Sequence, residues 1–353
     1  MNSWNRQGRR YGLLVSSIFV LLLSACGSSG TTTTTTTANG TATTITHLKI
    51  MVGGLSKQIY LPNKLTQQLG YFKQEGLEVT LIDEASGQSS ENELLAGQVD
   101  AGSGSYNHTI ELQPKGKQME AVVLLNIAPG EAEVVSAKAA SQIHSVKDLV
   151  GKNLGVTELG SGTQTLTTAL LHNAGIATDR VHFVPVGAGD TFIAALQQGK
   201  IDAGMTTEPT ISRVLSSGAG KVLVDLRSPE STQAALGGPY PFISLFMINS
   251  YVSSHKDVVQ KLVNAYVRTL KWMHTHTAAE IADKMPADYY AGNKALYVTA
   301  LQNQMAIFSP DGVMPTGAPE SVLSVENASK LIPTGSQINL NSTFTNEFVS
   351  KAS

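Results

Sequence analysis

Four loops rich in serine, threonine and glycine carry most of the side chains that could bind a ligand. Each adjoins a predicted helix, and the N-terminus of a helix offers unpaired N–H groups and a partial positive charge to an oxyanion or a polar group. A single loop of this kind is equally consistent with a helix cap that binds nothing. Four loops together favour a shared cleft, with these candidate binding residues: Ser86, Gly87, Ser103, Ser105, Tyr106, Ser161, Gly162, Thr163 and Asp190.

Charged and aromatic side chains add further candidates. Lys57 and Gln58 lie in a loop after the first predicted strand, and Tyr60 and Tyr240 could join Tyr106 in an aromatic wall. Glu208 precedes a proline and suits the first turn of a helix, where it could complement the helix dipole or meet an ammonium or ring N–H group of a solute. These residues leave two ligand classes open, an inorganic anion or sulfonate and a cationic or aromatic heterocycle. The loops contain no arginine, which disfavours a dicarboxylate.

The sequence predicts neither catalysis nor a metal site. It has no Gly-x-Ser-x-Gly elbow, P-loop, complete dinucleotide fingerprint or His-Glu-x-x-His motif. His274 and His276 are two residues apart and would not share a helix face. Asp100 and Asp202 each precede a predicted strand and are expected to stabilise a turn. We therefore expect no catalytic residue, no metal and no cofactor.

A strand–helix–strand phrase that occurs twice must position the candidate loops. It runs from Val79 to Gly102 and again from Val181 to Gly204, at a constant offset of 102 residues and without a gap. In each copy a strand of alternating apolar residues leads through a glycine turn into a helix, and Asp-Ala-Gly opens the next strand. Parallel crossovers leave their loops at the carboxyl ends of the strands, where α/β sheets bind ligands. We predict an α/β protein of two lobes, each a mixed, mainly parallel sheet flanked by helices, with the ligand cleft between them.

The N-terminus resembles an export signal with a lipid attachment site. Three arginines precede an apolar run over residues 13–23, which is shorter than the roughly 20 residues of a membrane-spanning helix. Leu23-Ser24-Ala25-Cys26 then resembles the lipobox of bacterial lipoproteins, and Cys26, the only cysteine, has no partner for an internal disulfide. The alternative is an ordinary signal peptide with an incidental cysteine. We expect a signal peptide over 1–26, lipid on Cys26 and a flexible threonine-rich tether over 27–46.

Composition and length limit the partners and the number of domains. The chain of 353 residues has 25 Lys and Arg against 27 Asp and Glu, so no basic field would recruit nucleic acid. Its length beyond the tether suits about two domains. We expect lobe one at 47–130 plus 239–353, with a C-terminal helical cover, and lobe two at 131–238. The chain should cross between the lobes near Pro129 and Pro239.

Five phrases in order resemble the solute-binding lipoproteins of ABC importers, in the branch for nitrate, sulfonate, taurine and thiamine-pyrimidine precursors. They lie within roughly residues 48 to 280: Leu69–Val79, Leu95–Asp100, Asp148–Lys152, Gly199–Ala203 and Glu208-Pro209. The resemblance implies a type II periplasmic-binding-protein fold that closes on a small polar solute and delivers it to a permease driven by an ATPase. It also implies an exported monomer, anchored by lipid at the membrane and facing the periplasm or cell surface.

Three alternatives share this fold. Fungal enzymes that make the thiamine pyrimidine resemble the chain but carry a cysteine-rich motif, whereas the only cysteine here is Cys26. Small dehydratases cannot be separated by motif, although a lipid anchor would remove the chain from cytoplasmic metabolites. A sensor subunit would have the same cleft, and a neighbouring kinase gene rather than permease and ATPase genes would indicate it.

Overall fold

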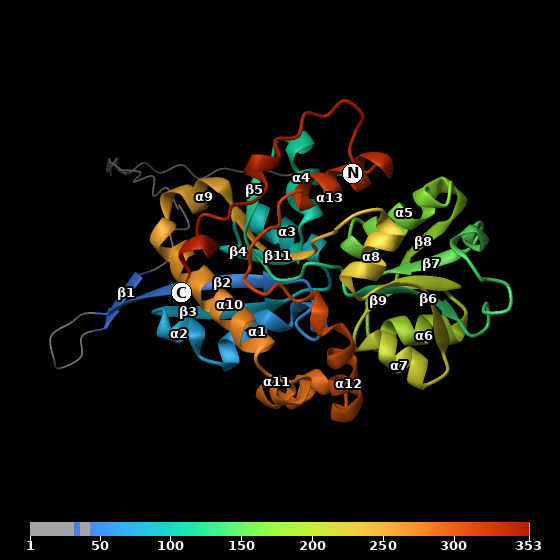
Figure 1. The fold of residues 1–353 in the computed structure, drawn as a ribbon, viewed down its shortest axis with the longest axis horizontal. Coiled ribbons are helices and arrows are strands. Elements are labelled where there is room, and N and C mark those ends of the chain that lie inside the picture. The colour runs from blue at the N-terminus through green and yellow to red at the C-terminus, as the bar shows by residue number, and fades with distance from the viewer. Residues whose placement is uncertain (1–31, 36–42, 353) are drawn as a thin grey trace, which may run out of the picture.

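The computed structural model describes residues 32–35 and 43–352, which contain two β-sheets, each flanked by helices (Figure 1). The first sheet is built from β1–β5 and β11, and the second from β6–β10. The chain therefore crosses to the second sheet after β5 and returns to the first with β11. We call the part around the first sheet lobe one and the part around the second sheet lobe two.

The sheet of lobe one has the order β1-β2-β4-β11-β5, with β3 also paired to β2. Residues of β2 alternate between its two faces: Ile50 and Val52 join the core shared with α1 and α10, whereas Met51 packs in the cluster that includes Leu94 of α3. The elements are β1 (Thr32–Thr35), β2 (Thr43–Val52), α1 (Leu61–Gln68), α2 (Tyr71–Gln74), β3 (Leu77–Asp83), α3 (Gly87–Leu95), β4 (Ala101–Ser105), α4 (Asn107–Glu111), β5 (Met119–Leu124) and β11 (Ile243–Ile248).

The sheet of lobe two has the order β10-β6-β9-β7-β8. Phe192 and Val214, from α6 and α7, pack on one face, and Leu171 of α5 packs on the other. The elements are β6 (Glu131–Ser136), β7 (Asn153–Val156), α5 (Gly162–Asn173), β8 (His182–Pro185), α6 (Asp190–Gln198), β9 (Ala203–Thr207), α7 (Thr210–Ser216), β10 (Gly220–Leu226) and α8 (Pro229–Leu236).

The repeated phrase forms the same unit in both lobes, β3–α3–β4 in one and β8–α6–β9 in the other. Its two aspartates have the predicted structural role. The Asp100 carboxylate accepts a hydrogen bond of 2.8 Å from the backbone N–H of Lys49, and that of Asp202 accepts one of 2.9 Å from Asn153. Each aspartate therefore ties the start of its strand to the neighbouring strand.

Both sheets are mixed, as predicted, but antiparallel pairs are more frequent than the sequence suggests. The parallel pairs are β2 with β3 and β4, and β7 with β8 and β9. The antiparallel pairs all involve β1 or strands outside the repeated phrases, namely β6, β10 and β11. Parallel order comes from the crossover units, whereas the strands that enter or leave a lobe run the other way.

The threonine-rich segment differs in part from the predicted tether. Thr32–Thr35 form β1, which pairs antiparallel with the first residues of β2, starting from Thr35 opposite Thr43. β-Branched threonines favour strands, and an edge strand offers unpaired backbone groups to such a segment. The predicted signal peptide and Cys26 lie outside the described residues.

The C-terminal helices pack on lobe one and also reach lobe two. The amphipathic α10 packs against α1 and β5, while α12 contacts α7 and α13 contacts α5 of the other lobe (Figure 1). Among the residues described, no helix combines the length and apolar character needed to span a bilayer. The elements are α9 (Asn249–Ser254), α10 (Lys256–His274), α11 (Ala278–Lys284), α12 (Lys294–Gln304) and α13 (Ala318–Ala328).

Candidate functional site

A small cavity, partly open to solvent, lies between the two lobes. Lobe one contributes the loop after β2, the start of α3 and the end of β4, and lobe two contributes the first residue of β6, the start of α5 and the end of β9. The cavity volume is about 20 Å³, which is room for about one water molecule. The lobes are therefore nearly closed on each other, and a larger solute requires them to separate. The lining residues are Lys57, Ile59, Tyr60, Ser86, Gly87, Ser105, Glu131, Thr157, Ser161, Gly162, Thr163, Thr207 and Phe242.

Lys57 brings an ammonium group to the lobe one side of the cavity. Its Nζ donates hydrogen bonds of 2.7 Å to the carbonyl oxygens of Gly53 and Ala85, and lies 5.9 Å from the centre of the Tyr60 ring. Burial lowers the pKa of Lys57 to about 8, although the carboxylates of Glu131, Asp83 and Glu158 oppose this shift. Two of its three N–H groups are thus committed to the backbone.

Glu131 brings a carboxyl group to the lobe two side. It is the first residue of β6 and only 3% exposed, and its Oε2 has no hydrogen-bond partner within the described part of the chain. Burial raises the pKa of Glu131 to about 8, and the Lys57 ammonium partly offsets this. Ser105, 2% exposed at the end of β4, also has a buried Oγ without a described partner. Buried polar atoms are normally paired, so these two atoms identify the part of the cavity that can receive a ligand.

The N-terminus of α3 is occupied by a carboxylate from the other lobe. Ser86, the N-cap residue, and Ser89 both donate hydrogen bonds to Glu158 Oε2, the latter at 2.8 Å. Glu158 lies in the loop between β7 and α5 of lobe two. A negative charge at a helix N-terminus interacts favourably with the helix dipole, so this contact favours the closed arrangement.

The N-terminus of α5 lies directly against lobe one. A Cβ atom added to Gly162 would be 2.8 Å from Ser105 Oγ and 2.7 Å from Phe242 Cζ, so only glycine allows this approach. The neighbouring hydroxyls are satisfied within the lobe: Ser161 Oγ donates to the Glu158 carbonyl at 2.6 Å, and Thr163 Oγ1 accepts a bond of 2.9 Å from the Thr157 backbone N–H. Ser161 and Thr163 line the cavity but already have partners.

A larger groove of about 470 Å³ adjoins the cavity and shares Lys57 with it. Both lobes line the groove, together with residues between α11 and α12. Its carboxylates come from Asp83, Glu84, Asp190 and Asp288, whereas its cationic groups come from Lys57 and Arg213. The route towards the cavity is therefore rich in acidic groups.

The structure brings eight of the predicted site residues to the cavity. They are Lys57, Tyr60, Ser86, Gly87, Ser105, Ser161, Gly162 and Thr163. They come from three of the four predicted loops and from the loop after β2. Asp190, from the fourth loop, is 87% exposed at its side chain, forms an ion pair with Arg213 and lines the groove instead.

The other predicted residues lie elsewhere, because tertiary contacts engage their polar atoms. Ser103 Oγ accepts a bond of 3.1 Å from Asn63, and Glu208 forms an ion pair of 2.8 Å with Arg227. Gln58 donates to the Tyr297 carbonyl oxygen at 2.8 Å. The hydroxyls of Tyr106 and Tyr240 are bound within lobe one, the first to Thr343 at 2.5 Å and the second to Glu326 at 2.8 Å.

Five lining residues were not predicted from the sequence: Ile59, Glu131, Thr157, Thr207 and Phe242. Two of them carried a recognisable signal. Thr207 lies at the repeat offset from Ser105, and both end the second strand of their unit. Glu131 follows the predicted crossing at Pro129 and is the first strand residue of lobe two. Phe242 and Thr157 depend on how the lobes meet, which the local pattern does not encode.

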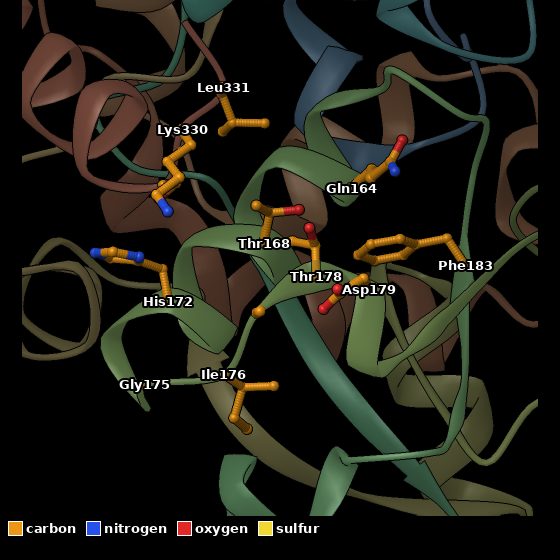
Figure 2. A pocket seen from close by; sticks show the side chains of 12 residues that line it. Gln164, Thr168, His172, Gly175, Ile176, Thr178, Asp179, Phe183, Lys330 and Leu331 are labelled. Atoms are coloured by element: carbon orange, nitrogen blue, oxygen red, sulfur yellow. The ribbon is translucent and has the colours of Figure 1, made fainter. Parts of the chain in front are cut away.

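Another hollow, shown in Figure 2, lies between α5 and the segment after α13. Its volume is about 780 Å³, with Thr168 and His172 on one side and Lys330 and Leu331 on the other (Figure 2). None of its lining residues has a buried side-chain polar atom left without a partner. By volume alone, this hollow would be the better candidate for a ligand site. The unpartnered polar atoms instead favour the cavity between the lobes as the ligand site.

The cavity can bind through hydrogen bonds and charge. Its lining combines hydroxyl groups with one ammonium, one carboxyl and the apolar surfaces of Ile59 and Phe242. Over residues 32–35 and 43–352, no group of three or more His, Cys, Asp or Glu side chains is placed to hold a metal ion. The site has the composition of a pocket for a small polar molecule.

Comparisons with known proteins bear on the family and the fold of the chain. The chain is 26% identical over 262 residues to the 4-amino-5-hydroxymethyl-2-methylpyrimidine phosphate synthase of Aspergillus parasiticus, a match that covers 71% of this chain and 73% of the other. A protein from Bordetella bronchiseptica RB50 is 33% identical with a TM-score of 0.83, over 86% of this chain and 96% of that one.

The alkanesulfonate-binding protein SsuA from Xanthomonas axonopodis pv. citri, solved with MOPS bound, has a TM-score of 0.67 at 17% identity, over 85% and 98% of the two chains. At this identity the likeness concerns the fold, and the predicted two-lobed periplasmic-binding-protein fold is confirmed. The model of the family described as NMT1/THI5 like matches residues 61–279, well over half of the chain. The chain therefore belongs to the NMT1/THI5-like family.

Proposed function

We propose that this chain is the extracytoplasmic solute-binding protein of an ABC import system, which captures a small polar solute between its lobes and delivers it to a permease. The observation that carries the proposal is the cavity lined from both lobes, in which Glu131 and Ser105 keep buried polar atoms without described partners. A ligand that satisfies both atoms would bind each lobe and stabilise the closed arrangement.

Lobe closure is the mechanism that the connections support. The chain passes between the sheets in two places, between β5 and β6 and between α8 and β11. Two lobes joined by short connections are typical of hinge closure around a ligand. The groove that shares Lys57 with the cavity would then serve as the entrance while the lobes are apart.

The proposed location rests on the N-terminal sequence. Export with lipid on Cys26 would hold the lobes close to a membrane permease. Cys26→Ala should release the protein into a soluble fraction or leave its signal uncleaved. Unchanged membrane partition and unchanged mass would contradict the anchor while leaving solute binding intact.

Two solute types enter the proposal. The sequence resemblance suggests a nitrate-, sulfonate- or taurine-like solute. The relationship to the Aspergillus enzyme supports the alternative, a thiamine-pyrimidine-like heterocycle, and Glu131 could accept a hydrogen bond from such a ring. We propose a binding role rather than synthesis because Cys26 is the only cysteine, whereas the related enzymes are expected to carry a cysteine-rich motif.

A ligand screen followed by solution scattering tests the binding role. Small anions, sulfonates, amines and thiamine precursors are added to the purified chain, and its melting temperature is measured. A ligand at 100 times its dissociation constant should add about 2.7 kcal/mol of stability. A bound solute should also narrow the distribution of interdomain distances in scattering. Stabilisation by a solute that still binds when Glu131 and Ser105 are both replaced would place the site elsewhere and overturn the proposal.

A further inference from the structure

The unpartnered carboxyl of Glu131 is the strongest indication of what the solute must offer. Glu131 is 3% exposed, lines the cavity and keeps Oε2 without a partner among the described residues. A buried carboxyl oxygen without a hydrogen-bond donor is costly, so an arriving donor gains more there than at the protein surface. An oxyanion at the same position would be compatible only with the protonated carboxyl and would be repelled by the ionised form.

None of the polar groups around Glu131 in the described part of the chain donates a hydrogen bond to its Oε2. From lobe one, Lys57 directs its ammonium to two backbone carbonyls, and Tyr60 adds a neutral phenol. On β6 itself, Glu133 is fully buried and accepts a bond of 2.8 Å from Thr167. The strands β9 and β10 flank β6 in the sheet. Near them, Arg227 forms ion pairs with both Glu208 and Asp225. Tyr240 faces this region from lobe one and is bound to Glu326.

The position that would suit an oxyanion is already taken. Glu158 accepts hydrogen bonds from Ser86 and Ser89 at the N-terminus of α3, which is the helix end where an anion would otherwise bind. A nitrate or sulfonate would have to displace this carboxylate and would then lie in a cavity that also contains Glu131. The cavity lining itself contains the carboxyl of Glu131 and the ammonium of Lys57.

The adjoining groove has the same bias. Its acidic residues are Asp83, Glu84, Asp190 and Asp288, and its basic residues are Lys57 and Arg213. Clefts lined mainly by one sign of charge concentrate solutes of the opposite sign. Entrance and cavity therefore favour the same class of solute.

We infer that the solute carries a positively charged nitrogen group, such as an alkylammonium, amidinium or guanidinium, and donates a hydrogen bond from it to Glu131. The inference rests on the proposed solute-binding role. Ser105 offers a second partner from the opposite lobe, so one nitrogen group can hold both lobes together. A solute whose only polar group is an oxyanion should bind weakly at this site.

Binding of such a cation should release a proton. Burial raises the pKa of Glu131 to about 8 in the empty protein, so near pH 7 this carboxyl is mostly protonated. A cation favours the carboxylate and lowers that pKa, and by linkage its affinity should increase as the pH rises from about 6 to about 8. An oxyanion should show the opposite trend.

The test uses the purified full chain and matched probes. Ethylguanidinium and ethanesulfonate have the same carbon chain and opposite charge, and taurine carries both kinds of group. We expect ethylguanidinium to raise the melting temperature more than ethanesulfonate or nitrate, with a larger shift at pH 8 than at pH 6. Calorimetric titration in two buffers of different ionisation enthalpy should show release of close to one proton near pH 7.

Variants on one strand provide the control. Glu131→Gln should weaken ethylguanidinium binding by about tenfold or more and abolish proton release, whereas Glu133→Gln, which does not line the cavity, should retain binding within about threefold. The wild-type calorimetry decides the matter if Glu131→Gln does not fold. The inference is overturned if no cationic probe binds, if ethanesulfonate binds more tightly, or if binding releases no proton. Tight binding of ethanesulfonate with compaction would overturn this inference but support the proposed function.

Discussion

Ser89 of lobe one donates a hydrogen bond of 2.8 Å to the carboxylate of Glu158 in lobe two. Ser86 donates to the same oxygen, so one side chain of lobe two holds the first turn of a helix in lobe one. The contact lies beside the cavity and would break when the lobes separate. The contact joins the start of α3 to the loop before α5, and the sequence analysis predicted binding residues at both places.

Removal of this contact should shift the ligand-free protein towards an open form. Glu158→Ala deletes two hydrogen bonds to a partly buried carboxylate, and we expect a loss of about 1 kcal/mol or more of closure free energy, which is roughly a fivefold or larger change in the closed-to-open ratio. Solution scattering should show a larger radius of gyration. Glu320→Gln, an exposed position on α13, is the control and should leave the profile unchanged. A Glu158→Ala profile identical to that of the wild type would show that the contact does not favour closure.

Replacement of Gly162 should prop the lobes apart. The Cβ atom of Gly162→Ala would meet Ser105 Oγ at 2.8 Å and Phe242 Cζ at 2.7 Å, both across the lobe boundary. Alanine has a higher helix propensity than glycine, so α5 itself should not be weakened. We expect affinity for the solute to fall about tenfold or more with little loss of melting temperature. His172→Ala, exposed on the same helix, should change neither quantity.

Ser103 and Ser105 should separate structural from binding roles within one strand. Ser103 Oγ accepts a hydrogen bond from Asn63, whereas Ser105 Oγ faces the cavity without a described partner. Ser103→Ala should cost about 0.5–1.5 kcal/mol of folding stability and leave affinity intact. Ser105→Ala should leave the melting temperature of the ligand-free protein unchanged and reduce affinity about two- to tenfold. Calorimetric titration measures the affinity of both variants, and thermal unfolding measures their stability. If Ser103→Ala lost affinity and Ser105→Ala lost only stability, Ser105 would not be a binding residue.

The ligand-free protein should lose stability as the pH rises from about 5 to about 8. Burial raises the pKa of both Glu131 and Glu133 to about 8, so in this range the folded state binds more protons than the unfolded state, whose glutamates titrate near about 4.3. Their contribution is present below the unfolded pKa and is lost as pH passes through the folded pKa. Lys57, whose pKa is lowered to about 8, acts with the opposite sign only above that range.

Denaturant unfolding at several pH values measures this slope. The double variant Glu131→Gln with Glu133→Gln should flatten it, whereas Glu320→Gln, at an exposed carboxyl, should not. A flat profile for the wild-type protein would mean that water or relaxation of the lobes solvates these two carboxyls.

The sequence predicts individual strands, helices and turns because these depend mainly on residues that are close together in the chain. Alternating apolar residues and glycine stops located β3–α3–β4 and β8–α6–β9, and the constant offset showed that the two units are equivalent. The aspartates before β4 and β9 were assigned to strand ends, and the structure confirms that role. The loops around Ser86 and Ser161 were also recognised as lying next to helices, because such loops depend on a few neighbouring residues.

The sequence by itself thus determined the two α/β lobes, the repeat and the family to which the chain belongs. The tertiary structure alone decided which polar atoms face the cavity. Ser103 and Ser105 are two residues apart on one strand, yet Asn63, distant in sequence, engages the first and leaves the second free. Glu131 gains its raised pKa from burial, and Glu158 gains its helix contact from the other lobe. Burial and partnership arise from packing between segments far apart in the chain, and the spacing of residues along one segment does not encode them.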